Sequence, residues 1–262
     1  MIPKIIHYCW MSGEPFPELI QECINTWEKF LPDYKIIEWN KNNFDVNISS
    51  FTKEAFDVKK YAFVSDYVRL YVLYKYGGIY LDSDIKVLKS FNDLLNNRAF
   101  SGFESKELVG VWLLASEKGN PLFKEMLDCY KEKHFIKEDG SFDLEPNTML
   151  LKPILEKYGI EFNNKYQKNN YITIYPKEYF CPLDGLTGKI SLTNNSYAMH
   201  LFNGAWLPKK QKRYFNLYKM YHSKYDKFYP QIITNLLVKL TINYKTRGVS
   251  GCIKKLLKKI KI

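Results

Sequence analysis

The chain has 262 residues, of which 46% are hydrophobic and 16% aromatic, so it is long enough for one large α/β domain or one domain with an appendage. Its five cysteines are odd in number and form no CxxC pair, which argues against a disulfide framework or a zinc site and predicts reduced thiols in a cytoplasmic protein. We expect no signal peptide, because the N-terminus lacks a charged leader followed by a long apolar segment. We expect no membrane-spanning helix, because every apolar stretch is shorter than the roughly 18 residues that such a helix needs.

The net charge of +11 is unevenly distributed along the chain. Residues 207–262 hold 15 Lys and Arg against a single acid, Asp226, whereas residues 1–206 hold 24 basic and 27 acidic side chains. This division predicts a catalytic or binding domain over 1–206 and a basic, aromatic and amphipathic helical extension over 207–262.

The first elements predict a βαβ unit. An apolar strand over Pro3 to Trp10 precedes a helix over Glu18 to Phe30, and a second strand follows over Tyr34 to Trp39. Such a unit normally belongs to a parallel sheet that binds ligands beyond the carboxyl ends of its strands. We therefore expect Trp10 and Asn40 at this ligand-binding rim.

The next helix carries a pair of opposite charges on an otherwise apolar surface. It is predicted over Tyr61 to Tyr76 and should be buried, since apolar residues cover most of its circumference. Asp66 and Arg69 are three residues apart and so share a face of the helix. Gly77 and Gly78 then end it.

Two aspartates follow a short apolar strand over Ile79 to Leu81. If the chain stays extended, Asp82 and Asp84 point to the same side, and a hard divalent cation would offset their repulsion. The spacing alone is equally compatible with a helix cap or a solvated turn.

The remaining elements are shorter. We predict strands over 85–91, 99–104 and 109–115, helices over 121–133 and from about Asn147, and short strands at the far edge of the sheet over 171–176, 189–193 and 196–202. In the extension, 231–244 and 251–262 read as short amphipathic basic helices.

The segments S-D-x-x-R and G-G-I-Y-L-D-x-D, together with the opening I-P-K-I-I-H-x-x-W, resemble the DXD-containing sugar transferases of glycosyltransferase family 32. This family includes bacterial capsular polysaccharide and lipopolysaccharide transferases and yeast initiating mannosyltransferases, and it is similar to the catalytic domain of the large clostridial glucosylating toxins. The resemblance covers Ile2 to about Trp206. It implies a GT-A fold, which is a Rossmann-like mixed sheet flanked by helices that binds a nucleotide sugar. It also implies Mn²⁺ or Mg²⁺ and transfer with retention of anomeric configuration.

The resemblance also suggests roles for individual residues. Trp10 would stack on the base of the donor, while Asp66 and Arg69 would hold hydroxyls of the sugar. Asp82 would contact the ribose, the sugar or the metal, and Asp84 would bind the metal.

Three further positions join this site. In H-L-F-N-G-A-W, His200 is a candidate metal ligand and Trp206 a candidate donor contact. Asn147, in E-P-N-T, is a candidate contact to the sugar or the acceptor. The alternatives are a structural histidine and an ordinary first helical turn. His7, inside the first strand, is expected to be buried and structural.

The predicted function is transfer of a hexose from a nucleotide sugar to a glycan or lipid-linked glycan acceptor, in capsule, exopolysaccharide or lipopolysaccharide synthesis. A UDP-sugar is the favoured donor and GDP-mannose the alternative. No enzymic nucleophile is inferred.

Two other functions stay open. One is a haloacid-dehalogenase-type phosphatase, although its motif has Thr or Val where this chain has Lys86, and it usually follows the first strand. The other is a non-enzymatic basic protein that binds membrane surfaces. The last 12 residues alternate Lys with Leu and Ile, which favours an anionic membrane over nucleic acid and predicts peripheral attachment to the inner face of the cell membrane. A solvated charged terminus remains the simplest alternative.

Overall fold

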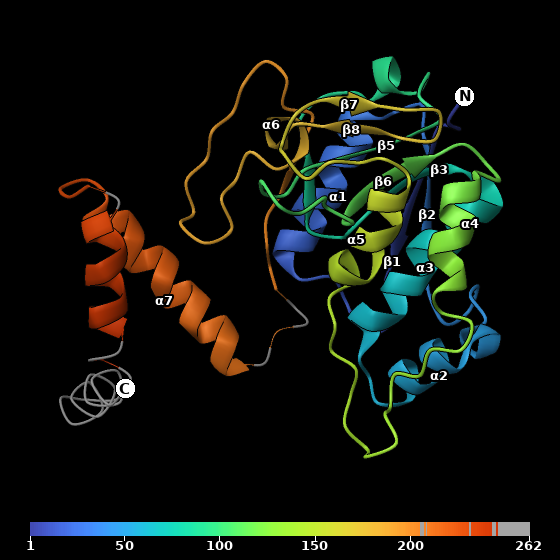
Figure 1. The fold of residues 1–262 in the computed structure, drawn as a ribbon, viewed down its shortest axis with the longest axis horizontal. Coiled ribbons are helices and arrows are strands. Elements are labelled where there is room, and N and C mark those ends of the chain that lie inside the picture. Colours follow the sequence, from blue (N-terminus) through green and yellow to red (C-terminus); the bar gives the residue numbers. More distant parts are fainter. Residues whose placement is uncertain (205–206, 208, 231, 243–244, 246–262) are drawn as a thin grey trace. The chain divides into compact units, whose positions relative to one another are not determined.

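The computed structural model describes residues 1–204, 207, 209–230, 232–242 and 245 (Figure 1). The chain forms two compact units. The first unit consists of Met1–Pro182 and Leu192–Asn203, and the second consists of Leu183–Ser191 and the described residues from Gly204 onward.

The first unit is built on a seven-stranded mixed sheet in the order β2-β1-β3-β6-β5-β8-β7 (Figure 1). Its strands are β1 (Ile5–Cys9), β2 (Lys35–Trp39), β3 (Gly78–Leu81), β5 (Ala99–Gly102), β6 (Leu113–Ser116), β7 (Gln167–Lys168) and β8 (Thr173–Tyr175). β1 runs parallel to β2 and β3, and β5 runs parallel to β8, whereas β6 is antiparallel to both of its neighbours. The predicted mixed sheet is confirmed.

Helices cover both faces of this sheet. They are α1 (Glu18–Phe30), α2 (Ser50–Asp57), α3 (Tyr61–Tyr76), α4 (Pro121–Asp128), α5 (Asn147–Lys157) and α6 (Lys177–Phe180), with the 3-10 turns η1 (Val46–Ile48) and η2 (Asn92–Leu94). One hydrophobic core contains residues of α2, α3, α4 and α5, and the other contains residues of α1, η2 and α6. The sheet therefore lies between two helical layers.

The N-terminal βαβ unit forms as predicted. α1 places Ile20, Cys23, Ile24 and Trp27 on one buried face, and the Trp27 indole donates a hydrogen bond to the Ile85 carbonyl (2.7 Å). This bond fixes the strand that follows the aspartates against α1.

His7 is fully buried in β1, as expected for a structural residue. Its Nδ1 accepts a hydrogen bond from the Trp39 indole (3.0 Å), and its Nε2 lies 2.9 Å from the Gly77 carbonyl. An imidazole with one accepting and one donating nitrogen is neutral. Burial lowers the pKa of His7 to about 4, although the bond to Gly77 partly opposes this shift.

The turn from α3 into β3 depends on two glycines. Gly77 has φ +70° and Gly78 has φ +106°, and a Cβ on Gly77 would lie 2.7 Å from the Lys118 backbone nitrogen. Glycine is the residue that fits this left-handed and crowded backbone. The predicted helix over 61–76 and its glycine stop are both confirmed.

A separate two-stranded sheet pairs β4 (Ile85–Val87) with β9 (Ala198–His200) in antiparallel register, with Ile85 opposite His200. The prediction that 196–202 lies at the far edge of the main sheet is therefore wrong. The predicted strand over 189–193 is also wrong, because only an isolated bridge from Ile190 to Leu183 forms there.

The second unit contains α7 (Lys209–Tyr225) and a helix over 232–242, which we call the helical pair. Among the described residues, no helix has both the length and the apolar character needed to cross a membrane. The helix predicted over 251–262 lies outside the described residues.

Candidate functional site

Arg69 is the centre of the candidate site. It lies on α3 and is 4% exposed, and its Nη2 is 3.0 Å from Asp66 Oδ1 and 3.1 Å from Asp82 Oδ1. Its Nη1 donates to the Val111 carbonyl (3.1 Å), and its guanidinium lies over the Tyr80 ring. One buried cation thus joins the helix to the end of β3.

The two aspartates after β3 lie in a turn and not on an extended strand. Ser83 and Asp84 are turn residues, and the Ile85 backbone N–H donates to the Asp82 carbonyl (3.1 Å). Strand alternation therefore does not align the two carboxylates, and this prediction is wrong. The turn instead holds the two carboxylates through different partners: Asp82 pairs with Arg69, and Asp84 lies beside His200 of β9.

The last residue of β9 and the residues that follow it contact Asp84. His200 Nε2 is 3.5 Å from Asp84 Oδ1, the Asn203 backbone N–H donates to Asp84 Oδ2 (2.8 Å), and the Leu201 N–H donates to the Asp84 carbonyl (3.1 Å). Phe202 adopts a left-handed φ of +51°. This uncommon conformation lies between Leu201 and Asn203, the two residues whose N–H groups donate to Asp84.

Asp82, Asp84 and His200 each offer one ligand atom, and these atoms all lie within 4.8 Å of one another. Two carboxylates and an imidazole form a donor set that suits Mn²⁺ or Mg²⁺. His200 Nδ1 is buried and has no hydrogen-bond partner among the described residues. The three side chains that the sequence predicts as metal ligands therefore lie together in an arrangement that fits a divalent cation.

The pKa values of the site's carboxyl groups are shifted in different directions. Burial, together with the charge of Asp82, raises the pKa of Asp66 to about 6 despite Arg69, and burial likewise raises the pKa of Asp82. Burial also opposes ionisation of the His200–Asp84 pair, but the partners outweigh it: the pKa of Asp84 falls and that of His200 rises. Asp84 is thus an ionised carboxylate close to a histidine.

Asn147 joins this group from another element. It is the first residue of α5 and is buried, its Oδ1 accepts from the Tyr130 hydroxyl (3.2 Å), and its Nδ2 lies 3.5 Å from the Asp66 carbonyl. The fold therefore brings Asn147 to the Asp66 side of the site.

The contacts of Trp10 and Asn40 are mostly local. Trp10 lies just after β1, bonds through its backbone N–H to the Trp39 carbonyl (2.8 Å), and donates its indole N–H to the Glu14 carbonyl (2.8 Å). The Asn40 side chain donates to Glu38 and accepts from the Asn42 backbone within its own turn. The two residues follow the neighbouring strands β1 and β2, and among the described residues no hydrogen bond or ion pair joins either side chain to Asp66, Asp82 or Asp84. Trp206 lies outside the described residues.

Sequence reasoning missed three residues that support the site. Trp112 stacks on His200 with ring centroids 5.0 Å apart and donates its indole N–H to Glu104 (2.9 Å). The Asn203 backbone and the Tyr130 hydroxyl are the others. A lone tryptophan, a backbone amide and a core tyrosine carry no motif, so only the fold identifies them.

The chain belongs to the family described as capsular polysaccharide synthesis protein, whose model matches residues 1–177. A mixed sheet with an acidic pair directly after β3 agrees with the GT-A type that the resemblance implied.

Two curated relatives are transferases by name. The chain is 28% identical over 147 residues to inositol phosphoceramide mannosyltransferase 1 of Schizosaccharomyces pombe, which covers 51% of this chain and 44% of that protein. It is 26% identical over 226 residues to the uncharacterized glycosyltransferase L373 of Acanthamoeba polyphaga mimivirus, covering 79% and 85%. These matches confirm the resemblance to sugar transferases, although the chain spans less than half the length of several relatives.

Among solved structures, the chain is similar to one described as PaToxG glycosyltransferase, with a TM-score of 0.46 and 23% identity. The alignment covers 60% of this chain and 69% of that one.

Proposed function

We propose that the protein is a metal-dependent glycosyltransferase that moves a hexose from a nucleotide sugar to a glycan or lipid-linked glycan acceptor. The observation that carries this proposal is the adjacency of two groups: the Asp82, Asp84 and His200 cluster, and the Asp66–Arg69 pair that touches it through Asp82. Membership of a family named for capsular polysaccharide synthesis supports it.

Each group would perform a separate task. Asp82, Asp84 and His200 would hold Mn²⁺ or Mg²⁺, and such an ion neutralises the charge that develops on a diphosphate leaving group. Arg69 and Asp66 would hold and orient hydroxyls of the donor sugar, because a guanidinium and a carboxylate are the donor and acceptor that a hydroxyl needs. Trp10 and Asn40 would bind the nucleotide, and Asn147 would contact the sugar or the acceptor.

The finer assignments extend the same proposal. We infer retention of configuration without an enzymic nucleophile, a UDP-sugar as donor with GDP-mannose as the alternative, and a place in bacterial capsule, exopolysaccharide or lipopolysaccharide synthesis. Residues 1–206 would form the catalytic domain of a cytoplasmic protein. The phosphatase alternative is not favoured, because the acidic pair follows β3 and the first strand ends at Cys9.

The decisive experiment measures hydrolysis of UDP- and GDP-sugars with Mn²⁺, with and without EDTA. Hydrolysis should require the metal, and Asp84→Asn should lower kcat/KM by about 100-fold or more, because it removes a charged ligand. Asp139→Asn, on an exposed loop, is the matched control and should leave the rate unchanged. Hydrolysis that persists in EDTA, or an Asp84→Asn variant as active as the control, would contradict the proposal.

A further inference from the structure

The helical pair of the second unit has a small core of its own. Tyr218 and Tyr221 of α7 pack against Val238 and Ile242 of the helix over 232–242. The Tyr218 hydroxyl donates to Asn235 Oδ1 (2.9 Å). The helix over 232–242 thus has one apolar face that is already covered by α7.

That helix has a second apolar face, which is exposed. Ile232, Leu236 and Leu240 recur every four residues and are 85%, 59% and 48% exposed. Ile233 lies beside them, and Phe228, in the turn that precedes the helix, is 76% exposed. We call these five residues the apolar edge. A helix with two apolar faces, only one of them packed, indicates that a further surface covers the other.

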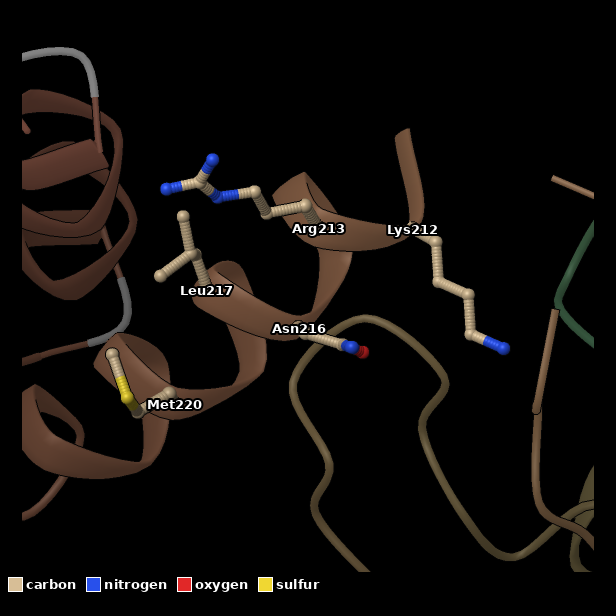
Figure 2. A pocket seen from close by; sticks show the side chains of 5 residues that line it. All are labelled: Lys212, Arg213, Asn216, Leu217 and Met220. Atoms are coloured by element: carbon tan, nitrogen blue, oxygen red, sulfur yellow. The ribbon is translucent and has the colours of Figure 1, made fainter. Parts of the chain in front are cut away.

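The charge around the apolar edge is mostly positive. Lys224, Lys227 and Lys239 are exposed on the same helices and turn, and Asp226 is the only acid in residues 207–262. A hollow of about 400 Å³ on α7 repeats the mixture of cationic and apolar side chains, with Lys212, Arg213, Asn216, Leu217 and Met220 as its lining. Figure 2 shows the Arg213 guanidinium on the same side of α7 as Leu217, with Lys212 extending away from it.

We propose that the apolar edge docks on an anionic lipid bilayer, with Phe228, Ile232 and Leu236 entering the interface and the surrounding lysines contacting lipid phosphates. This is how basic amphipathic helices bind membranes peripherally. The inference goes beyond sugar transfer and does not rest on it. It moves the predicted membrane contact from the last 12 residues to the helical pair.

Charge argues against the other occupants. Residues 246–262 carry six Lys and Arg and no acid, so they would be repelled by the lysines around the apolar edge, and a second copy of the helical pair would be repelled equally. Nucleic acid is attracted by lysine but is bound by aromatic stacking, and four of the five residues of the apolar edge are aliphatic, Phe228 being the aromatic one. A bilayer satisfies both the charge and the aliphatic surface.

The test is flotation of the full chain with vesicles of phosphatidylcholine alone and with added phosphatidylglycerol. The chain should bind the anionic vesicles and not the neutral ones, and added salt should weaken the binding. Ile232→Ser with Leu236→Ser should weaken binding at least about tenfold, because it removes the aliphatic side chains that enter the bilayer.

The matched control is Leu144→Ser with Leu192→Ser, which changes two residues of the first unit that are 51% and 57% exposed. This variant should bind like the parent, and circular dichroism should show unchanged helix content in both variants. Unchanged binding by the Ile232/Leu236 variant, equal binding to neutral vesicles, or no binding of the parent chain would each overturn the proposal.

Discussion

The Arg69 guanidinium forms ion pairs with two carboxylates, those of Asp66 and Asp82. Burying one charge among apolar residues is costly, and Arg69 offsets this cost with two aspartates, the Val111 carbonyl and the Tyr80 ring. Burial opposes its charge, but the acids raise the pKa of Arg69 further above its ordinary value. The cation stays charged and links Asp66 of α3 to Asp82 in the turn after β3.

His7 predicts how stability depends on pH. Its pKa is about 4 in the folded chain and 6.5 when unfolded, so its contribution is complete above pH 6.5 and is lost as the pH falls toward 4. Between pH 7.5 and 4.5 this loss amounts to about 2 kcal/mol. Asp66, whose pKa is raised, acts in the opposite direction between pH 4 and 6, so the wild-type curve alone does not isolate His7.

The contribution of His7 is therefore measured as a difference in the free energy of unfolding between two proteins. Urea unfolding of the wild type and of His7→Gln is compared at pH 7.5 and 4.5. The wild type should lose about 2 kcal/mol relative to the variant at the lower pH. An unchanged difference between the two proteins at both pH values would contradict the buried neutral imidazole.

At this scale, the sequence predicted the residue types of the site better than their contacts. Asp66 and Arg69 follow from helical spacing, because residues three apart always share a face. The bond from Arg69 to Asp82 and the approach of His200 to Asp84 depend on where β3, α3 and β9 cross. Such distances between elements are set by packing, which local spacing does not encode.

At the scale of elements, the α3–β3 turn is the most constrained connection near the site. Gly77→Ala would place a Cβ 2.7 Å from the Lys118 nitrogen in a left-handed backbone, so both overpacking and strain oppose it. Together they should lower the free energy of unfolding by about 3 kcal/mol or more.

Gly119→Ala is the matched control. Gly119 has φ +75° but no atom within 4 Å of an added Cβ, so only the strain of about 1–2 kcal/mol applies. Urea unfolding of both variants measures the two losses. Equal losses would show that contact with Lys118 does not constrain the turn.

Element prediction succeeded for α1, whose buried face has a clear period, and for α3, which is apolar around most of its circumference and is followed by two glycines. α1 and α3 have the predicted bounds because apolar spacing and flanking Pro or Gly define them. The strand predicted over 189–193 did not form, because a short run of β formers pairs only if a partner strand lies beside it. β9 does form, because it pairs with β4. This pairing joins segments that are far apart in the sequence, so periodicity does not predict it.

At the scale of the whole molecule, the acidic and basic side chains are divided unevenly between residues 1–206 and residues 207–262. Residues 1–206 hold 24 basic and 27 acidic side chains and contain the Asp82, Asp84 and His200 cluster, whereas all of the excess positive charge follows residue 206.

Metal binding should stabilise the folded chain whether or not a sugar is transferred. An ion that binds only the native state adds about 2.7 kcal/mol at 100 times its Kd, which for a protein of this size raises Tm by roughly 5–10 °C. Differential scanning calorimetry with Mn²⁺ and then with EDTA measures this shift. Asp84→Asn should abolish the Tm shift and Asp139→Asn should retain it, because Asp84 belongs to the cluster and Asp139 does not. A full Tm shift in the Asp84→Asn variant would show that the metal binds elsewhere on the chain. The function of the Asp82–Asp84 turn would then be separate from metal binding.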